Sequence, residues 1–274
     1  MDLIGRSYAM IDKNIPLFRF PDAKQIVVCG DIHGDFNLLV HKMCVTYDMH
    51  NTLLIVSGDC GFGFENKGYY DNIVRRNSRR MNSYNNWIVF VRGNHDNPAY
   101  FDGKVFAHKR FLAVPDYSVI EACGHQVLCI GGAISIDRQY RKEWQENPKH
   151  HIDRSCVLAP NVYWENEAPV YNEELLGKIG EHYQIDTVVT HSAPSFCELL
   201  NKNGLDDWAQ KDKSLLSDVA CERMTMDNIY EKLKTMNMPL SKWYYGHFHQ
   251  SHHEAIDGML FSMLDIIEIM KLTS

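Results

Sequence analysis

The sequence predicts an α/β fold in which short buried strands alternate with helices. Five apolar runs of strand length are spread along the chain, and each is followed by a loop that carries an aspartate, an asparagine or a histidine. Residues with the apolar spacing of a helix follow the first of these loops, so the repeating unit is a strand, a polar loop and a helix. Ligands bind at the carboxyl ends of the strands in open α/β sheets, which is where these polar side chains fall.

The composition is that of an ordinary globular protein. Hydrophobic residues make up 45% and charged residues 23% of the 274 residues, and the net charge is −7, which counts against a scaffold for long nucleic acids. The eight cysteines include no C-x-x-C pair, and the first residues lack the apolar segment of an export signal. No run of about 18 apolar residues occurs. We therefore expect one domain over residues 1–274, a cytoplasmic location and no membrane partner.

The first unit begins with the apolar run at residues 25–29. Asp31 and His33 follow it two positions apart, a spacing that lets a carboxylate and an imidazole face one divalent cation. Residues 36–45 then have helical apolar spacing, and Asp35 is the expected N-cap.

The second unit is a buried strand at residues 53–57. Asp59 follows it, and Gly58 permits a close approach of the backbone to a site. We interpret Cys60 as a structural thiol rather than a nucleophile, because no histidine is adjacent in sequence to activate it. The arginines within residues 66–84 are interpreted as a solvated helix face.

The third unit is a strand at residues 87–91 and the loop that follows it. Asn94 offers a neutral amide oxygen, and His95 points away from it as a proton donor or a phosphate contact would. Asp96 has two interpretations of equal weight, since it either orients the imidazole of His95 or caps the turn before Pro98.

A strand at residues 126–130 is followed by two arginines three positions apart. Arg138 and Arg141 either share a helix face that binds a phosphate or are ordinary surface residues. The polar, irregular segment at residues 143–172 is a candidate substrate-facing loop, because such long connections are usually functional or loosely ordered.

Two further units complete the series. His191 ends a strand at residues 186–190, and His247 and His249 follow a strand at residues 243–245, with their imidazoles on the same side of an extended loop. The polar segment at residues 196–222 is a second candidate substrate-facing loop.

The five loops together supply oxygen and nitrogen ligands and no thiolate. This donor set suits a pair of divalent cations rather than a structural zinc site. Its members are Asp31, His33, Asp59, Asn94, His191, His247 and His249.

These blocks resemble the ordered signature motifs of the calcineurin-like metallophosphoesterase superfamily. The matching segments are Gly30-Asp31-Ile32-His33, Gly58-Asp59, Gly93-Asn94-His95-Asp96, Thr190-His191 and Gly246-His247-Phe248-His249. They occur in the family's order from about residue 25 onward, and five ordered blocks are far more specific than any single motif.

The resemblance implies a four-layer α/β/β/α sandwich of two mixed sheets and a site for two metal ions. The donor atoms suit manganese, iron and zinc alike and do not select one of them. It implies that one metal is held by Asp31, His33 and His249 and the other by Asn94, His191 and His247. Asp59 is expected to bridge the two metals together with a hydroxide that attacks phosphorus. His95 is expected to protonate the leaving group or to steady the transition state.

The chain departs from the serine/threonine phosphatases of this superfamily at two motifs. Those enzymes have Asp-Arg-Gly shortly after the second block, where this chain has Cys60-Gly61-Phe62-Gly63-Phe64, and Asp96 replaces their glutamate. These differences weaken a protein-phosphatase assignment, and the Gly131-Gly132 segment resembles a bacterial or phage-type branch instead.

The expected substrate is therefore a small phosphate ester or a nucleotide, with monoesters and diesters both open. A nuclease that acts on short nucleic acids and a non-catalytic metal-binding module on the same fold are the alternatives.

Overall fold

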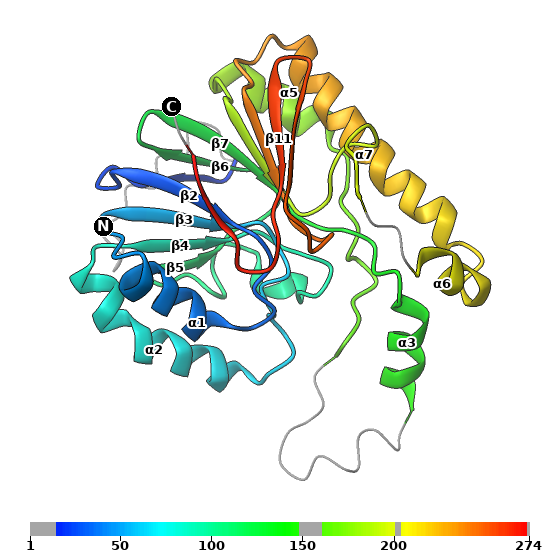
Figure 1. The fold of residues 1–274 in the computed structure, drawn as a ribbon, viewed down its shortest axis with the longest axis horizontal. Helices are drawn as coiled ribbons and strands as arrows, with labels where there is room; N and C mark the ends of the chain where they lie inside the picture. The colour runs from blue at the N-terminus through cyan, green and yellow to red at the C-terminus, as the bar shows by residue number, and fades with distance from the viewer. Residues whose placement is uncertain (1–14, 148–160, 201–203, 273–274) are drawn as a thin grey trace.

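The computed structural model describes residues 15–147, 161–200 and 204–272, whose strands form two mixed sheets (Figure 1). The larger sheet contains, in spatial order, β1 (Leu17–Arg19), β6 (Ser118–Ala122), β7 (His125–Ile130), β8 (Thr187–Thr190), β9 (Lys242–Tyr245), β11 (Met259–Met263) and β10 (His252–Ile256). The smaller sheet contains β12 (Ile269–Lys271), β2 (Gln25–Cys29), β3 (Thr52–Val56), β4 (Trp87–Phe90) and β5 (Phe111–Ala113). The α-helices of the described residues are α1 (Phe36–His41), α2 (Lys67–Ser83), α3 (Arg138–Glu146), α5 (Glu173–His182), α6 (Leu205–Lys211) and α7 (Leu215–Thr235).

The strand register places the site loops at one level. In the smaller sheet, the parallel strands β2, β3 and β4 end together, because Cys29 pairs with Val56 and Val56 pairs with Phe90. In the larger sheet β7, β8 and β9 are also parallel neighbours. Loops that leave the carboxyl ends of these strands therefore begin close to one another.

Successive side chains of a strand point to opposite faces of its sheet, so the core has three layers of buried side chains. One layer lies between the two sheets, and the other two lie between each sheet and its helices. Ile26 and Val28 of β2 face the other sheet and join the cluster between the sheets, whereas Val27 and Cys29 face α1 and α2. On the larger sheet, one face packs against α5 and α7, as Leu128 of β7 does. Figure 1 shows the same arrangement, with α1 and α2 over the smaller sheet and α5 and α7 over the larger one. The predicted four-layer α/β/β/α sandwich is confirmed.

Several predicted elements differ in extent from the structure. The helix expected at residues 36–45 is α1, which ends at His41 and continues as a π-helical turn over Lys42–Thr46. Asp35 occupies its N-cap position, but its side chain makes no capping hydrogen bond.

Both segments expected to be irregular contain helix. Residues 143–146 are the end of α3, and the segment at residues 196–222 contains α6 and the start of α7. Apolar spacing failed to reveal α6 because its seven residues, LDDWAQK, include only two large apolar side chains. Residues 148–160 of the first segment lie outside the described residues.

The interpretation of Cys60 as a structural thiol is supported, and two further cysteines share its environment. Cys29, Cys60 and Cys129 are buried and free, and burial raises the pKa of each thiol above its ordinary value. The Cys60 thiol donates to the carbonyl oxygen of Val91, so it ties two strand-end loops together. The arginines of α2 are exposed, as predicted. Among the described helices, none combines the length and the apolar character needed to cross a membrane.

Candidate metal centre

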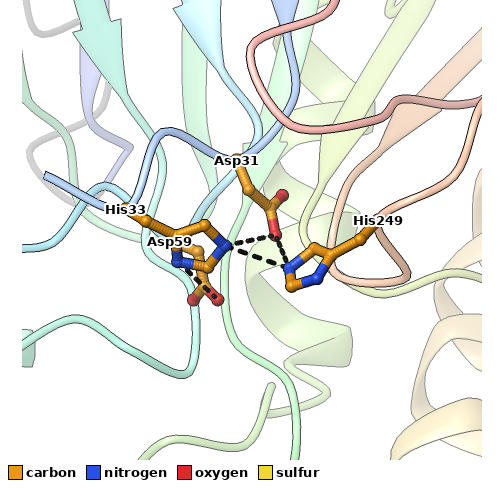
Figure 2. Close-up of side chains that lie close together, drawn as sticks. All are labelled: Asp31, His33, Asp59 and His249. Atoms are coloured by element: carbon orange, nitrogen blue, oxygen red, sulfur yellow. Dashed lines mark hydrogen bonds and ion pairs between the residues drawn. The ribbon is translucent and has the colours of Figure 1, made fainter. Parts of the chain in front are cut away.

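Four of the predicted ligands converge at one point (Figure 2). Asp31 and His33 follow β2, Asp59 follows β3, and His249 follows β9, and one donor atom from each lies within 4.8 Å of all the others. Asp31 Oδ2 is 3.0 Å from His249 Nε2, and the Nε2 atoms of His33 and His249 are 3.0 Å apart. Two imidazole nitrogens and two carboxylates at this separation form a plausible set of ligands for one divalent cation in both chemistry and spacing.

A second group of predicted ligands lies on the other side of Asp59. His191 Nε2 is 3.2 Å from Asp59 Oδ1 and 2.9 Å from Asn94 Oδ1. The ring of His247 packs against that of His191 with their centroids 5.0 Å apart. The structure thus brings Asn94, His191 and His247 together, each from the end of a different strand.

Asp59 lies between the two groups. Its Oδ1 faces His191, while its Oδ2 lies 4.0 Å from His33 Nδ1. The backbone N–H of His95 donates to Oδ1 at 2.8 Å, which fixes the carboxylate in this orientation. One buried carboxylate is therefore directed at both groups.

The ring of His191 is oriented by the backbone. Its Nδ1–H donates to the carbonyl oxygen of Ser57 at 2.8 Å, so its Nε2 is the nitrogen that faces Asp59 and Asn94. A backbone or carboxylate acceptor on the far nitrogen is the usual way in which proteins fix a metal-ligating imidazole.

Asn94 is oriented by a chain of side chains that the sequence did not reveal. Its Nδ2 donates to Ser135 Oγ at 2.8 Å, and the Ser135 hydroxyl donates to Glu167 Oε2 at 2.6 Å. Glu167 is almost fully buried, and burial raises its pKa to about 7. Because the amide nitrogen is engaged by Ser135, the amide oxygen of Asn94 is left to face His191.

A further buried carboxylate supports the same region. Glu222 of α7 accepts hydrogen bonds from the Ile134 N–H and from the Ser192 hydroxyl, next to His191. Nothing in the sequence singled out Glu222, which stands between Cys221 and Arg223 in a helix of mixed composition. For Ser135, the signal was the glycine-rich segment after β7.

An unpartnered buried nitrogen of His247 is a second, independent observation in favour of metal binding. The Nδ1 atom of His247 is buried and has no hydrogen-bond partner among the described residues, whereas its backbone N–H donates to Asp31 Oδ1. A buried polar atom without a partner is costly unless a ligand or ion satisfies it.

The backbone around the centre adopts uncommon conformations. Positive φ angles occur at His33 (43°), Asp59 (45°), His247 (71°) and His249 (51°). Each such residue costs on the order of 1–3 kcal/mol, and they cluster at functional sites where the surrounding structure enforces them.

Strand-end glycines allow the loops to pack this closely. A Cβ on Gly58 would lie 2.1 Å from His191 Nδ1, and one on Gly93 would lie 2.1 Å from the Asp59 backbone nitrogen. The glycines in the predicted motifs are therefore required by the contact between one ligand loop and the next.

In the centre, burial and the neighbouring charges shift the pKa values of Asp59 and His191 in opposite directions. Burial by itself would raise the pKa of Asp59, but His95 and His191 hold it well below its ordinary value. Burial would lower the pKa of His191, yet Asp59 and Asp31 raise it to about 9. Burial, and then the charge of His191, lower the pKa of His247 well below its ordinary value. Without a bound cation His191 is therefore protonated at neutral pH, and a cation would take the place of this proton.

His95 and Asp96 occupy different environments. His95 Nδ1 is 3.5 Å from Asp59 Oδ2, and its ring is partly exposed at the edge of the centre. The fully buried carboxylate of Asp96 instead accepts four backbone N–H groups, from Cys60, Gly61, Phe62 and Gly93. Among the described contacts it makes none with the imidazole of His95. These contacts favour a role for Asp96 in shaping the loops over the turn-capping and imidazole-orienting interpretations, and they give no support to a catalytic role.

The two predicted substrate-binding arginines also differ. The guanidinium of Arg138 is paired with Asp212 and Asp218 and donates to Ser214, so it joins α3 to the start of α7. Arg141 pairs with Asp137 and lines the cavity beside the centre. The geometry therefore leaves Arg141 as the arginine in reach of a substrate, while Arg138 holds the cavity wall in place.

The chain matches the family model described as Calcineurin-like phosphoesterase over residues 24–251, and it belongs to that family. The description of this family is that of phosphoesterases, which hydrolyse phosphate esters.

The individual relatives are more distant. The catalytic subunit of serine/threonine-protein phosphatase 6 from Caenorhabditis elegans is 29% identical over 131 residues, which cover 43% of this chain and 38% of that protein. A dimetal phosphatase from Danio rerio aligns at 12% identity over 92% of this chain and 87% of that chain, with a TM-score of 0.43. A putative 5'-nucleotidase from Staphylococcus aureus aligns at 12% identity over 90% of this chain and 49% of that chain, with a TM-score of 0.39.

Proposed function

We propose that the protein hydrolyses a phosphomonoester or phosphodiester with the help of two divalent cations held on either side of Asp59. The observation that carries this proposal is the orientation of Asp59, whose two oxygens face His33 and His191 in two separate groups of ligands. When bound, such a pair of cations polarises a phosphoryl oxygen and supplies a nucleophilic water at neutral pH.

The residues have distinct tasks in this proposal. Asp31, His33 and His249 hold one cation, Asn94, His191 and His247 hold the other, and Asp59 is shared. In the net reaction a water oxygen bonds to phosphorus, the ester P–O bond breaks, and the leaving oxygen gains a proton. Manganese, iron and zinc all suit these donors.

In this proposal His95 acts on the phosphoryl group or the leaving oxygen, and the partly exposed position of its ring beside Asp59 supports this role. Burial lowers the pKa of His95 below its ordinary value, with Asp59 opposing this effect, and the lowering favours the neutral imidazole. A neutral imidazole still donates one hydrogen bond, which suits the stabilisation of charge on the transferred group.

The decisive experiment measures metal content and ester hydrolysis in the same preparations. We expect about two metals per chain and turnover of an aryl phosphate or a bis-aryl phosphate. Asp59→Asn should lose both metal and turnover, because an amide cannot bridge two cations. His95→Ala should keep its metal and lose turnover, and Asp71→Asn on the exposed face of α2 should resemble the unaltered protein.

Other outcomes would favour the alternatives. Metal-loaded protein that is inert towards a broad panel of esters would point to a non-catalytic binding module. Rapid cleavage of short single-stranded DNA with little activity on small esters would point to a nuclease. Unaltered turnover in Asp59→Asn would contradict the proposal.

A further inference from the structure

A cavity of about 440 Å³ adjoins the metal centre, and its size suits a small organic ligand. One side of this cavity is formed by the centre itself, through Asp59, Asn94 and His95. The remaining side chains decide which group can lie next to a phosphate bound at the centre.

One wall of the cavity is made by α6 and α7. Leu205 and Trp208 are three residues apart on α6, so they share a helix face, and both line the cavity. Val219 of α7 lies one turn before Glu222 and also lines it. In Figure 1, α6 and the first half of α7 extend away from the two sheets, on the same side of the molecule as α3.

The other apolar side chains that line the cavity come from loops at the strand ends. Ile134 and Ile136 follow β7 in the sequence. Phe248 stands in the sequence between His247 and His249, two of the predicted metal ligands. The wall next to the phosphate site is therefore apolar, although it is built from segments far apart in the sequence. An apolar surface of this kind beside a polar centre is typical of a ligand-binding pocket.

The polar groups in the cavity are largely engaged by the protein. Glu222 accepts from Ile134 and Ser192, and Arg141 pairs with Asp137. Arg223 Nη2 donates to the backbone carbonyls of Pro194 and Cys197, and the guanidinium carbon lies 5.6 Å from the centroid of the Phe248 ring. Its Nη1 is buried and has no hydrogen-bond partner among the described residues. Apart from Nη1 of Arg223, these side chains offer few free polar groups to a leaving group, so apolar contacts dominate on this side of the cavity.

The α6 wall is held in place before any ligand binds. Tyr140 of α3 packs against Trp208 with their ring centroids 6.3 Å apart, and Lys211 lies 5.1 Å from the Trp208 centroid. Arg138 ties α3 to Asp212 and Asp218 on either side of the α6–α7 connection. Such pre-organisation lowers the entropy cost of binding.

We propose that this cavity binds the leaving group of the substrate and that this group carries a flat aromatic ring system. The inference rests on the proposed phosphoesterase function and narrows its substrate class. Trp208 and Phe248 come from different segments, and aromatic side chains bind flat rings by stacked or edge contacts. The ring belongs either to an aryl ester or to the base of a nucleotide.

Two matched pairs of substrates test this inference on the metal-loaded, full-length protein. Phenyl phosphate and 2-naphthyl phosphate differ by one fused ring, and ribose 5-phosphate and adenosine 5'-monophosphate differ by the base. We expect kcat/KM to rise about tenfold or more on adding the ring in at least one pair, since apolar pocket contacts discriminate at this level. The pair that responds identifies the source of the ring.

Variants of the cavity wall test whether the rise in kcat/KM on adding the ring depends on this cavity. Trp208→Ala and Leu205→Ala should bring the two members of the responding pair towards equal kcat/KM, while Trp208→Phe should keep most of the difference. Leu216→Ala is the matched control, because Leu216 is an exposed leucine of α7 outside the cavity lining.

The failures are distinguishable. Hydrolysis of both members of each pair at similar kcat/KM would overturn the inference and leave the phosphoesterase function standing. A ring effect that survives in Trp208→Ala and Leu205→Ala would also overturn it. No hydrolysis of any of these monoesters by metal-loaded protein would overturn the inference, and the proposed function would fall with it only if bis-aryl phosphates were also left intact.

Discussion

Asn94 shows how much of the centre depends on residues that bind no metal themselves. An asparagine can present either its oxygen or its nitrogen to a site, and only the oxygen is a metal ligand. The hydrogen bonds from Asn94 to Ser135 and from Ser135 to Glu167 select the orientation with the oxygen inward.

The first prediction follows from this chain. Ser135→Ala removes the acceptor of the Asn94 amide, so one of the two metals should bind about 10–100-fold more weakly, as is usual when a second-layer partner is lost. Competition with a chelator measures the affinity. The control is Ser262→Ala in β11, since Ser262 is buried and its hydroxyl has no partner among the described residues. Equal metal affinity in the two variants would show that Ser135 does not position Asn94.

The second prediction concerns pH and His191. Asp59 and Asp31 raise the pKa of His191 to about 9 against the opposing effect of burial, so the metal-free ring carries a proton at pH 7. A cation that uses Nε2 must displace this proton, and the apparent affinity should rise as the pH rises towards about 9. Calorimetric titration with metal in buffers of different ionisation enthalpy should report about one proton released from this ring at pH 7.5. An affinity that is flat between pH 6.5 and pH 9 would mean that His191 is already neutral or binds no metal.

At the scale of elements, each ligand loop depends on the loop beside it. Gly58 lies two residues after the end of β3, has a φ of +108°, and packs against the His191 ring that follows β8 in the other sheet. The contact joins the two sheets at their carboxyl edges.

The third prediction uses this contact. Gly58→Ala places a Cβ 2.1 Å from His191 Nδ1, so the ring must move and lose its hydrogen bond to Ser57. Overpacking of this kind costs about 1–3 kcal/mol, and metal should be lost as well. Thermal unfolding in chelator and metal analysis measure the two effects.

The matched control is Gly177→Ala within α5. A Cβ there meets no atom within 4 Å, so the change should preserve metal content and stabilise the helix by up to about 1 kcal/mol. If Gly58→Ala keeps full metal content, the close packing of the loops is not required for the centre.

At the scale of the whole molecule, the centre joins the two sheets. Asp31, Asp59 and Asn94 leave strands of the smaller sheet, whereas His191 and His247 leave strands of the larger one. Any cation bound between them links the two halves of the sandwich.

The fourth prediction is that metal stabilises the entire fold. The melting temperature should increase with metal concentration, because binding to the folded state alone contributes about 2.7 kcal/mol at 100 times Kd. Differential scanning calorimetry of chelated and metal-loaded protein measures the shift, which Asp59→Asn should abolish. Identical melting temperatures with and without metal would contradict a cation at this interface of the sheets.

Local sequence was sufficient for the strands and for the residue types at their ends. Buried strands show up as short apolar runs, and a glycine next to an acidic residue or a histidine marks a close-packed loop within a few residues of each run. For that reason the α/β class and the five ligand-bearing loops were predictable.

Tertiary structure alone decided the contacts between distant segments. The partners of Arg138 are Asp212 and Asp218, and Ser135 joins Asn94 to Glu167, which are links across 32 or more residues. Periodicity describes one segment at a time, so it cannot indicate which segment another will meet, nor that α6 would form a cavity wall. The sequence thus determined the fold class and the donor set, and the packing of the two sheets determined how those donors are oriented and what lies beside them.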